Sequence, residues 1–389
     1  MKLKALTTQN FRNLLGNPPS FCDGINVLYG DNAAGKTNTL EAIYLFATGK
    51  SFRTKNEKDF IRHTEEFARL EIEFEGAGAD RRMSVAYLSG GAKTTKAMQI
   101  EGIGVERVSE FLGNFRAVLF TPDHLELVKG APEERRRLVD MALCQIQPRF
   151  IRSLNEYAKL LAQRNNYLKG LKFSGKEPDL DYIDVLNMQL SKVGATVTKQ
   201  RALYCEKLCS IASGIYARLA GGEESLDIKY VSRIKTEDFS DENLLSQLLY
   251  EMYKSDTPRD IELCKTSHGP HHDELMIYLR KKGERQSFDE METEELTQYA
   301  ARTFGSQGQQ RSAVLAIKLS EGEIIKEKCG EYPVFLLDDL FSELDDKRRK
   351  KLTEMFCDKQ CIITCCDRAA IPDGIDMNVI CVENGRYKN

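Results

Sequence analysis

Long apolar runs are missing from this chain of 389 residues: none approaches the ~20 consecutive apolar residues that a membrane-spanning helix requires. The first residues turn polar too soon for a signal peptide. The eleven cysteines contain no Cys-x-x-Cys pair, which argues against a metal site or a disulfide framework and favours reduced thiols packed as small apolar side chains. These absences predict a cytoplasmic protein with no membrane partner.

An excess of charge of either sign is also missing. The 56 Lys and Arg against 59 Asp and Glu give a formal net charge of −3, so any DNA contact must come from a local basic surface. With 41% hydrophobic and 30% charged residues, the composition is that of a folded globular protein. A chain this long exceeds the usual size of one core, and we therefore expect two lobes.

The order of hydrophobic patterns divides the chain. Strand patterns punctuated by glycine fill the first 120 residues, and apolar residues at three- and four-residue spacing then indicate helices from Pro132 to Leu219. The predicted strands are 25–29, 68–74, 82–88, 334–337 and 361–364. We predict an α/β core made of residues 1–121 and 300–389, interrupted by a mainly helical arm lobe at 122–299.

A sequence that fits G-x-x-x-x-G-K-[ST] follows the first of these strands and precedes a helical pattern that Gly49 is placed to end. Its residues are Gly30, Asp31, Asn32, Ala33, Ala34, Gly35, Lys36 and Thr37. Glycines let the backbone N–H groups turn toward phosphate oxygens, and the helix N-terminus adds its dipole. Lys36 would bind the β- and γ-phosphates and Thr37 would ligate Mg²⁺. An ordinary glycine-rich turn is the alternative, which the strand–loop–helix context disfavours.

Two acids, Asp338 and Asp339, end the apolar strand pattern 334–337. A fully apolar strand belongs in the centre of a parallel sheet, and ligands bind at the carboxyl end of such strands. Asp338 is therefore a candidate ligand of Mg²⁺, and Asp339 could polarise the attacking water. A strand that ends in a solvated turn would show the same acids.

A loop with Ser306, Gly308 and Gln309 precedes a second helical pattern and resembles the signature loop of ABC ATPases. A serine can cap the helix and a glycine allows close approach of a phosphate. A plain capped helix is the alternative. The loop's position before the two acids favours the signature, as does a resemblance to the ABC D-loop that follows them at Ser342, Glu343, Leu344 and Asp345.

Together these motifs resemble the RecF family of bacterial recombination mediators, which are ABC/SMC-type ATPases (P-loop NTPases). The resemblance runs nearly end to end, and the short helical insertion between Lys36 and Ser306 distinguishes the chain from full SMC proteins. The matching stretches are Asn10–Asn13, Gly30–Asn38, Gly49–Arg53, Lys129–Gly130, Arg135–Arg137, Gly269–His271 and Ser306–Arg311. In three places the chain departs from the family pattern: Asp339 stands for the usual Glu, His272 for the usual Arg, and no histidine follows the strand 361–364.

The resemblance implies a head-to-tail homodimer in which ATP bridges Lys36 of one copy and Ser306 of the other. Slow, DNA-dependent hydrolysis would open this dimer. It also implies binding of duplex, gapped or junction DNA, and assistance to RecA loading with RecO and RecR in repair and replication restart. Asn38 and Arg12 would lie at the nucleotide, and Arg53 would contact nucleotide or DNA. The alternative for both arginines is a solvated surface position.

Residues 129–172 form a basic stretch, with ten Lys and Arg against four Asp and Glu. Such a local excess is typical of contact with the phosphate backbone of DNA, although a solvated helical face would look the same. The candidate DNA-binding residues here are Lys129, Arg135, Arg136, Arg137, Arg152, Lys159 and Arg164. A second hypothesis is an ABC-type ATPase module that serves another protein machine without DNA.

Overall fold

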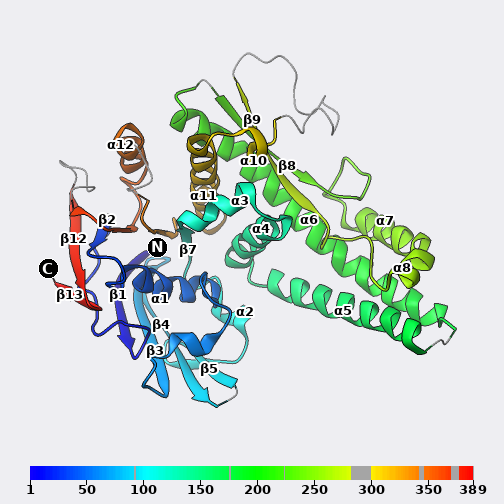
Figure 1. Ribbon diagram of the computed structural model, residues 1–389, viewed down its shortest axis with the longest axis horizontal. Helices are drawn as coiled ribbons and strands as arrows, with labels where there is room; N and C mark the ends of the chain where they lie inside the picture. The colour runs from blue at the N-terminus through cyan, green and yellow to red at the C-terminus, as the bar shows by residue number, and fades with distance from the viewer. Residues whose placement is uncertain are drawn as a thin grey trace. The chain divides into compact units, whose positions relative to one another are not determined.

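The computed structural model describes residues 1–91, 93–174, 177–222, 224–281, 299–340, 346–368 and 376–388. By its internal contacts the chain divides into two compact units (Figure 1). Unit 1 comprises residues 1–125, 215–222 and 308–389, and unit 2 comprises residues 126–214 and 223–307. The lobe boundaries expected from the sequence, 121/122 and 299/300, stay a prediction.

The core of unit 1 is a six-stranded sheet of order β13-β12-β2-β11-β10-β7. Its strands are β2 (Ile25–Tyr29), β7 (Ala117–Phe120), β10 (Val334–Leu337), β11 (Cys361–Cys365), β12 (Met377–Glu383) and β13 (Arg386–Lys388). All neighbours run parallel except β12 and β13, which form a hairpin. Every residue of β7, β10 and β11 is buried, as expected of central parallel strands.

Helix α1 (Lys36–Thr48) follows β2 and ends at Gly49, which adopts a left-handed conformation and donates its N–H to the Leu45 carbonyl. Helix α11 (Gln307–Cys329) precedes β10 and is buried along much of its length. Shorter elements complete unit 1: η1 (Glu57–Phe60), α2 (Val108–Phe111), η2 (Pro122–Leu125) and α12 (Asp346–Met355). The predicted strand and helix patterns around the glycine-rich loop are therefore confirmed.

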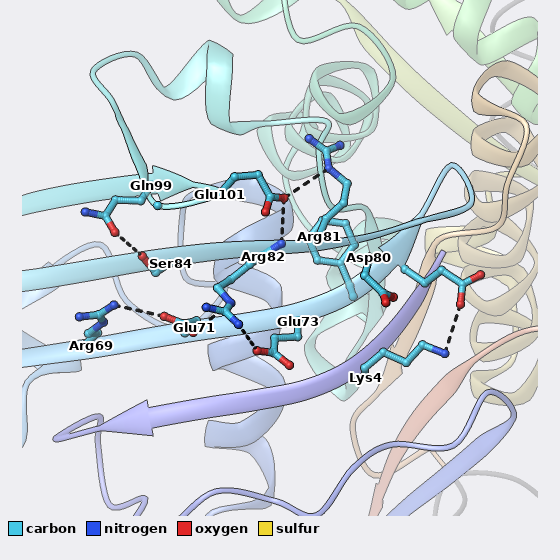
Figure 2. Close-up of a pocket in the computed structure, with 13 residues that line it drawn as sticks. Lys4, Arg69, Glu71, Glu73, Asp80, Arg81, Arg82, Ser84, Gln99 and Glu101 are labelled. Carbon is cyan, nitrogen blue, oxygen red and sulfur yellow. Dashed lines mark hydrogen bonds and ion pairs between the residues drawn. The ribbon is translucent and has the colours of Figure 1, made fainter.

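A second, antiparallel sheet in unit 1 has the order β1-β3-β4-β5-β6. Its strands are β1 (Lys2–Gln9), β3 (Phe67–Gly76), β4 (Ala79–Gly90), β5 (Lys93–Ile100) and β6 (Ile103–Val105). Buried and exposed residues alternate along β3, so one face packs and the other is polar. On the polar face a hollow of about 800 Å³ is lined by charged residues that pair with one another, as Arg82 with Glu73 and Arg81 with Glu101 (Figure 2).

Unit 2 is mainly helical. Its elements are α3 (Glu126–Lys129), α4 (Pro132–Ile146), α5 (Phe150–Ser174), most of α6 (Leu180–Leu219), β8 (Glu224–Val231), α7 (Glu242–Ser255), α8 (Thr257–Leu263), β9 (Glu274–Lys281) and α10 (Ala301–Phe304). Strands β8 and β9 form an antiparallel pair. The helical pattern predicted from Pro132 to Leu219 is thus confirmed as three successive helices.

A buried polar centre in unit 2 consists of Arg164, Asn187, Asp260 and Thr266. The Arg164 side chain is completely buried and donates to Asn187 Oδ1 (2.8 Å), Asp260 Oδ2 (2.7 Å) and Thr266 Oγ1 (2.9 Å). These partners come from α6, α8 and the segment after α8, so one guanidinium joins α5 to three other parts of the unit.

Two further findings concern membrane-spanning helices and disulfides. No helix in the described part of the chain is both long and apolar enough to span a bilayer. The eleven cysteines, all of which lie in the described ranges, form no disulfide.

Candidate nucleotide site

The carboxyl ends of three adjacent strands of unit 1 bring the site together. The glycine-rich loop follows β2, Asp338 follows β10, and β11 lies between these two strands with Thr364 near its end. We call the group Lys36, Thr37, Asp338 and Thr364 the nucleotide edge. Residues more than 300 positions apart thereby meet, as the parallel-sheet prediction required.

The side chain of Lys36 folds back onto the backbone of the glycine-rich loop. Lys36 Nζ donates to the carbonyls of Gly30 (2.7 Å) and Asp31 (2.8 Å). Its side chain is almost entirely buried. The amine is therefore held over the loop by neutral acceptors, which a phosphate oxygen could replace.

Asp338 lies between two threonine hydroxyls. Thr37 Oγ1 donates to Asp338 Oδ1 (2.9 Å) and Thr364 Oγ1 donates to the same oxygen (2.7 Å). Burial raises the pKa of Asp338 above its ordinary value, although the two hydroxyls favour the carboxylate. The backbone N–H of Asp339 donates to Thr364 Oγ1 (2.9 Å), so one hydroxyl fixes both acids.

The donor set at this edge fits magnesium. A threonine hydroxyl and a carboxylate in direct contact are hard oxygen donors, which Mg²⁺ prefers, usually together with water and phosphate oxygens. Within the described residues, no cluster of three or more His, Cys, Asp or Glu is arranged to hold a metal without a ligand's help. A threonine hydroxyl and a carboxylate at this edge therefore fit Mg²⁺ held together with the phosphate oxygens of a nucleotide.

Arg12 and Arg53 converge on one buried carboxylate, that of Glu41 in α1. Arg12 donates to both Glu41 oxygens (2.8 and 3.0 Å), and Arg53 lies 3.8 Å from one of them. Arg53 also donates to Asn38 Oδ1 (2.5 Å), beside the loop. Arg12 lies in the turn after β1, with a left-handed φ of 50°.

Glu41 was missed by sequence reasoning. It is the one acid in a helix whose other buried residues are mostly apolar, and it lies four positions after Thr37. That spacing puts it on the same helical face as Thr37. A carboxylate on the buried side of an otherwise apolar helix was the available signal.

The signature residues lie where the sequence predicted, at the start of a helix. Ser306 directly precedes α11, whose first residue is Gln307, and Gly308 and Gln309 lie in its first turn. The Gly308 carbonyl accepts from Ser312 Oγ (2.9 Å). The D-loop candidates Ser342, Glu343, Leu344 and Asp345 fall outside the described residues.

The candidate DNA-binding residues of unit 2 separate into three groups: exposed, half-buried and buried. Lys129, Arg152 and Lys159 are exposed, and the last two lie seven positions apart on one face of α5. Arg136 and Arg137 are half-buried, and Arg136 donates to the Asp273 carbonyl (2.7 Å).

The predictions for Arg164 and Arg135 were wrong. Arg164 is sealed in the buried polar centre, where no phosphate can reach it. Arg135 is buried too, with its guanidinium bound to both oxygens of Glu274 (2.7 and 3.2 Å) and to the carbonyls of Leu127 and Gly130. These two arginines hold the fold of unit 2 together, and sequence alone does not separate such residues from exposed ones in a basic stretch.

Comparison with known proteins covers almost the entire chain. The family model described as the RecF/RecN/SMC N-terminal domain matches residues 2–386. The DNA replication and repair protein RecF of Staphylococcus carnosus is 35% identical over 359 residues, which are 92% of this chain and 91% of that protein. RecF of Clostridium perfringens is 34% identical over 390 residues, with 100% of both chains covered.

A solved structure agrees with the sequence comparisons. It is described as the recombination mediator protein RecF with ATP in the RecFOR pathway. Its TM-score with this chain is 0.86 at 31% identity, and the match covers 100% of this chain and 97% of that one. With a six-stranded sheet that carries a phosphate-binding loop, and with this likeness along its full length, the chain belongs to the RecF family of ABC/SMC-type ATPases.

Proposed function

We propose that this chain is an ATP-dependent recombination mediator of the RecFOR pathway, in which ATP closes a homodimer on DNA. One observation carries the proposal: the hydroxyl of Thr37 and the carboxylate of Asp338 meet at the edge where Lys36 ends the phosphate-binding loop. The related RecF structure with ATP supports the choice of nucleotide.

The residues of the nucleotide edge have separate roles. The loop N–H groups and Lys36 would bind the phosphates, while Thr37 and Asp338 would hold Mg²⁺, directly or through water. Bound Mg²⁺ would neutralise charge on the phosphate oxygens and orient them. Asp339 would polarise the attacking water. Because an aspartate is one methylene shorter than the family's glutamate, we expect slow hydrolysis.

Dimer closure follows from the signature residues Ser306, Gly308 and Gln309. A helix N-terminus is a phosphate-binding site, and this one would bind the γ-phosphate held by the loop of a second copy. Hydrolysis would remove that shared phosphate and open the dimer. Arg12, anchored on Glu41, would lie beside the nucleotide.

DNA contact is proposed for the exposed members of the basic stretch and for Arg53. Lys129, Arg152 and Lys159 present charge without an acidic hydrogen-bond partner among the described contacts, as phosphate-backbone binding requires. We expect gapped or junction DNA as the partner, with RecR and RecO acting on the same pathway. A cytoplasmic location stays a prediction.

A substitution of the loop lysine tests the proposal. We expect Lys36→Met to abolish ATP-dependent dimerisation in sizing experiments and to lower retention on gapped DNA at least tenfold, because the phosphates lose their fixed positive charge. Its melting temperature without nucleotide should stay close to that of the unchanged protein. ATP-dependent DNA retention that survives Lys36→Met would contradict the proposal.

The alternative is an ABC-type ATPase that serves another protein machine without binding DNA. The two readings differ in salt dependence. Affinity of the ATP-loaded chain for gapped DNA should fall steeply between about 50 and 200 mM salt if the basic residues bind phosphates. Dimerisation with ATP but no DNA binding at either salt concentration would favour the alternative.

A further inference from the structure

Three successive carbonyl groups of the phosphate-binding loop accept hydrogen bonds on the side facing away from the N–H groups. The Ala33 carbonyl accepts from Asn13 Nδ2 (2.9 Å), and the Ala34 carbonyl accepts from the N–H of Gly385 (2.8 Å). The Gly35 carbonyl accepts from the N–H of Thr39 (3.0 Å) and from Thr39 Oγ1 (3.1 Å). Two of these donors come from segments remote in sequence from the loop.

The β12–β13 hairpin supplies the middle contact. Strand β12 pairs with β2 as far as Cys381, which lies opposite Tyr29. This pairing places the hairpin turn beside the start of the loop. Gly385 lies in that turn, donates its N–H to Ala34 and accepts from the N–H of Leu15 (2.8 Å). One residue thus connects the loop to the turn that contains Asn13.

Gly385 has no room for a side chain. Its φ is +76°, and a Cβ placed on it would lie 1.9 Å from the carbonyl oxygen of Asn13. Any other residue there must move either the hairpin or the Asn13 turn. The loop approaches β12 as closely at a second point, where a Cβ on Gly30 would lie 2.1 Å from the Val382 oxygen.

Tyr387 of β13 supports the third carbonyl indirectly. Its hydroxyl lies 2.8 Å from Thr39 Oγ1. Because Thr39 donates its proton to the Gly35 carbonyl, the tyrosine hydroxyl is the donor to Thr39. Burial raises the pKa of Tyr387 to about 12, so the hydroxyl keeps its proton at neutral pH.

The physical consequence lies in the geometry of the peptide group. In a planar trans peptide the C=O and N–H point in opposite directions. The carbonyls of Ala34 and Gly35 share their peptide units with the N–H groups of Gly35 and Lys36. Donors that fix these two carbonyls therefore fix the direction of two N–H groups at the helix N-terminus, where phosphate binds.

We propose that the β12–β13 hairpin and the Asn13 turn position the phosphate-binding N–H groups, with Asn13, Gly385 and Tyr387 as positioning residues for nucleotide binding. The proposal rests on the ATP site proposed above. It assigns to these segments a function besides packing: without them the loop keeps its sequence but loses the orientation of its donors.

Gly385→Ala tests the proposal, with Gly78→Ala as its matched control. Gly78 has the same φ of +76°, but a Cβ there would meet nothing within 4 Å. The two variants therefore introduce similar backbone strain, and only one displaces the hairpin or the Asn13 turn. We expect Gly385→Ala to weaken binding of a fluorescent ATP analogue with Mg²⁺ by about tenfold to a hundredfold, and Gly78→Ala by less than twofold.

Hydrogen–deuterium exchange gives a readout that needs no nucleotide. Exchange of the peptide that covers residues 30–36 should be faster in Gly385→Ala than in Gly78→Ala. If the full-length protein binds no ATP, the proposed function fails, while the exchange difference still decides the positioning role. Equal analogue affinity and equal exchange in the two variants would overturn the inference.

Tyr387→Phe decides the matter should Gly385→Ala fail to fold. It removes one hydroxyl and keeps the ring, so we expect about a fivefold loss of analogue affinity, from one hydrogen bond. The melting temperature without nucleotide should change little. If Gly385→Ala does not fold, analogue affinity of Tyr387→Phe equal to that of the unchanged protein would overturn the inference.

Discussion

The nucleotide edge of unit 1 and the buried polar centre of unit 2 both hold charged groups away from water, but with different partners. In unit 2, Arg164 is neutralised by the carboxylate of Asp260. In unit 1, Lys36 is held by backbone carbonyls and Asp338 by threonine hydroxyls, all of them neutral. A buried charge with a charged partner stabilises the fold, whereas one held by neutral groups can still bind a ligand of opposite charge.

The largest expected effect tests the first half of this comparison. Arg164→Ala should lower the free energy of unfolding by about 3–5 kcal/mol, because it leaves the buried Asp260 carboxylate without its ion-pair partner. Denaturant unfolding measures the change. Arg152→Ala on the same helix is the control: it is exposed, and its unfolding free energy should change by about 0.5 kcal/mol or less. If the two variants proved equally stable, the distinction between structural and exposed arginines would fail.

The pH dependence of the free energy of unfolding tests a second buried group of unit 2, the imidazole of His271. Its Nδ1 lies 2.6 Å from the Tyr157 hydroxyl and its Nε2 lies 3.2 Å from the Thr266 carbonyl, an arrangement that suits the neutral ring. Burial, together with the neighbouring His272 and two arginines, lowers the pKa of His271 to about 4 from its ordinary 6.5. Between about pH 4 and pH 6.5, His271 therefore binds a proton in the unfolded chain but not in the folded chain.

The stability that His271 contributes should be complete above pH 6.5 and lost as the pH falls through about 4. We expect unfolding experiments across this range to show a loss on the order of 2 kcal/mol that His271→Gln lacks. The exposed His63 serves as the control, and His63→Gln should keep the pH dependence of the unchanged protein. Parallel curves for both variants would show that His271 is not the group responsible.

The smallest effect concerns the neutral partners at the nucleotide edge. Thr364→Val removes the hydroxyl that donates to Asp338 and accepts from the Asp339 N–H, so we expect ATP hydrolysis to fall about tenfold. Thr364→Ser keeps the hydroxyl and should keep most of the activity. Turnover at saturating ATP is the measurement, since the loop that binds the phosphates is unchanged. Equal turnover of the valine and serine variants would show that the acids need no such support.

Much of the fold could be predicted from the sequence because its signals are local. The strand 334–337 is a short apolar run ended by acids, and the phosphate-binding loop has fixed residue types at fixed spacing. The parallel sheet then dictates that Thr37 and Asp338 meet, since both follow the carboxyl ends of central strands.

What the sequence did not predict depends on which side chains are buried. Arg164 and Arg152 occur in the same basic stretch and on the same helix, and only the packing of α6 and α8 around Arg164 distinguishes them. Likewise nothing in the sequence links Asn13 or Gly385 to the loop, because the Asn13 side chain reaches a carbonyl 20 positions away and the Gly385 N–H reaches one 351 positions away.

The contact of Gly385 with Ala34 has a consequence for biosynthesis. The loop is translated early, but its support cannot form until residue 385 has left the ribosome, after the whole of unit 2 has been made. Contacts of such sequence separation form late, since closing a long loop costs conformational entropy. In a nascent chain the glycine-rich loop therefore lacks this contact until residue 385 has emerged, although all of the loop's own residues were made early.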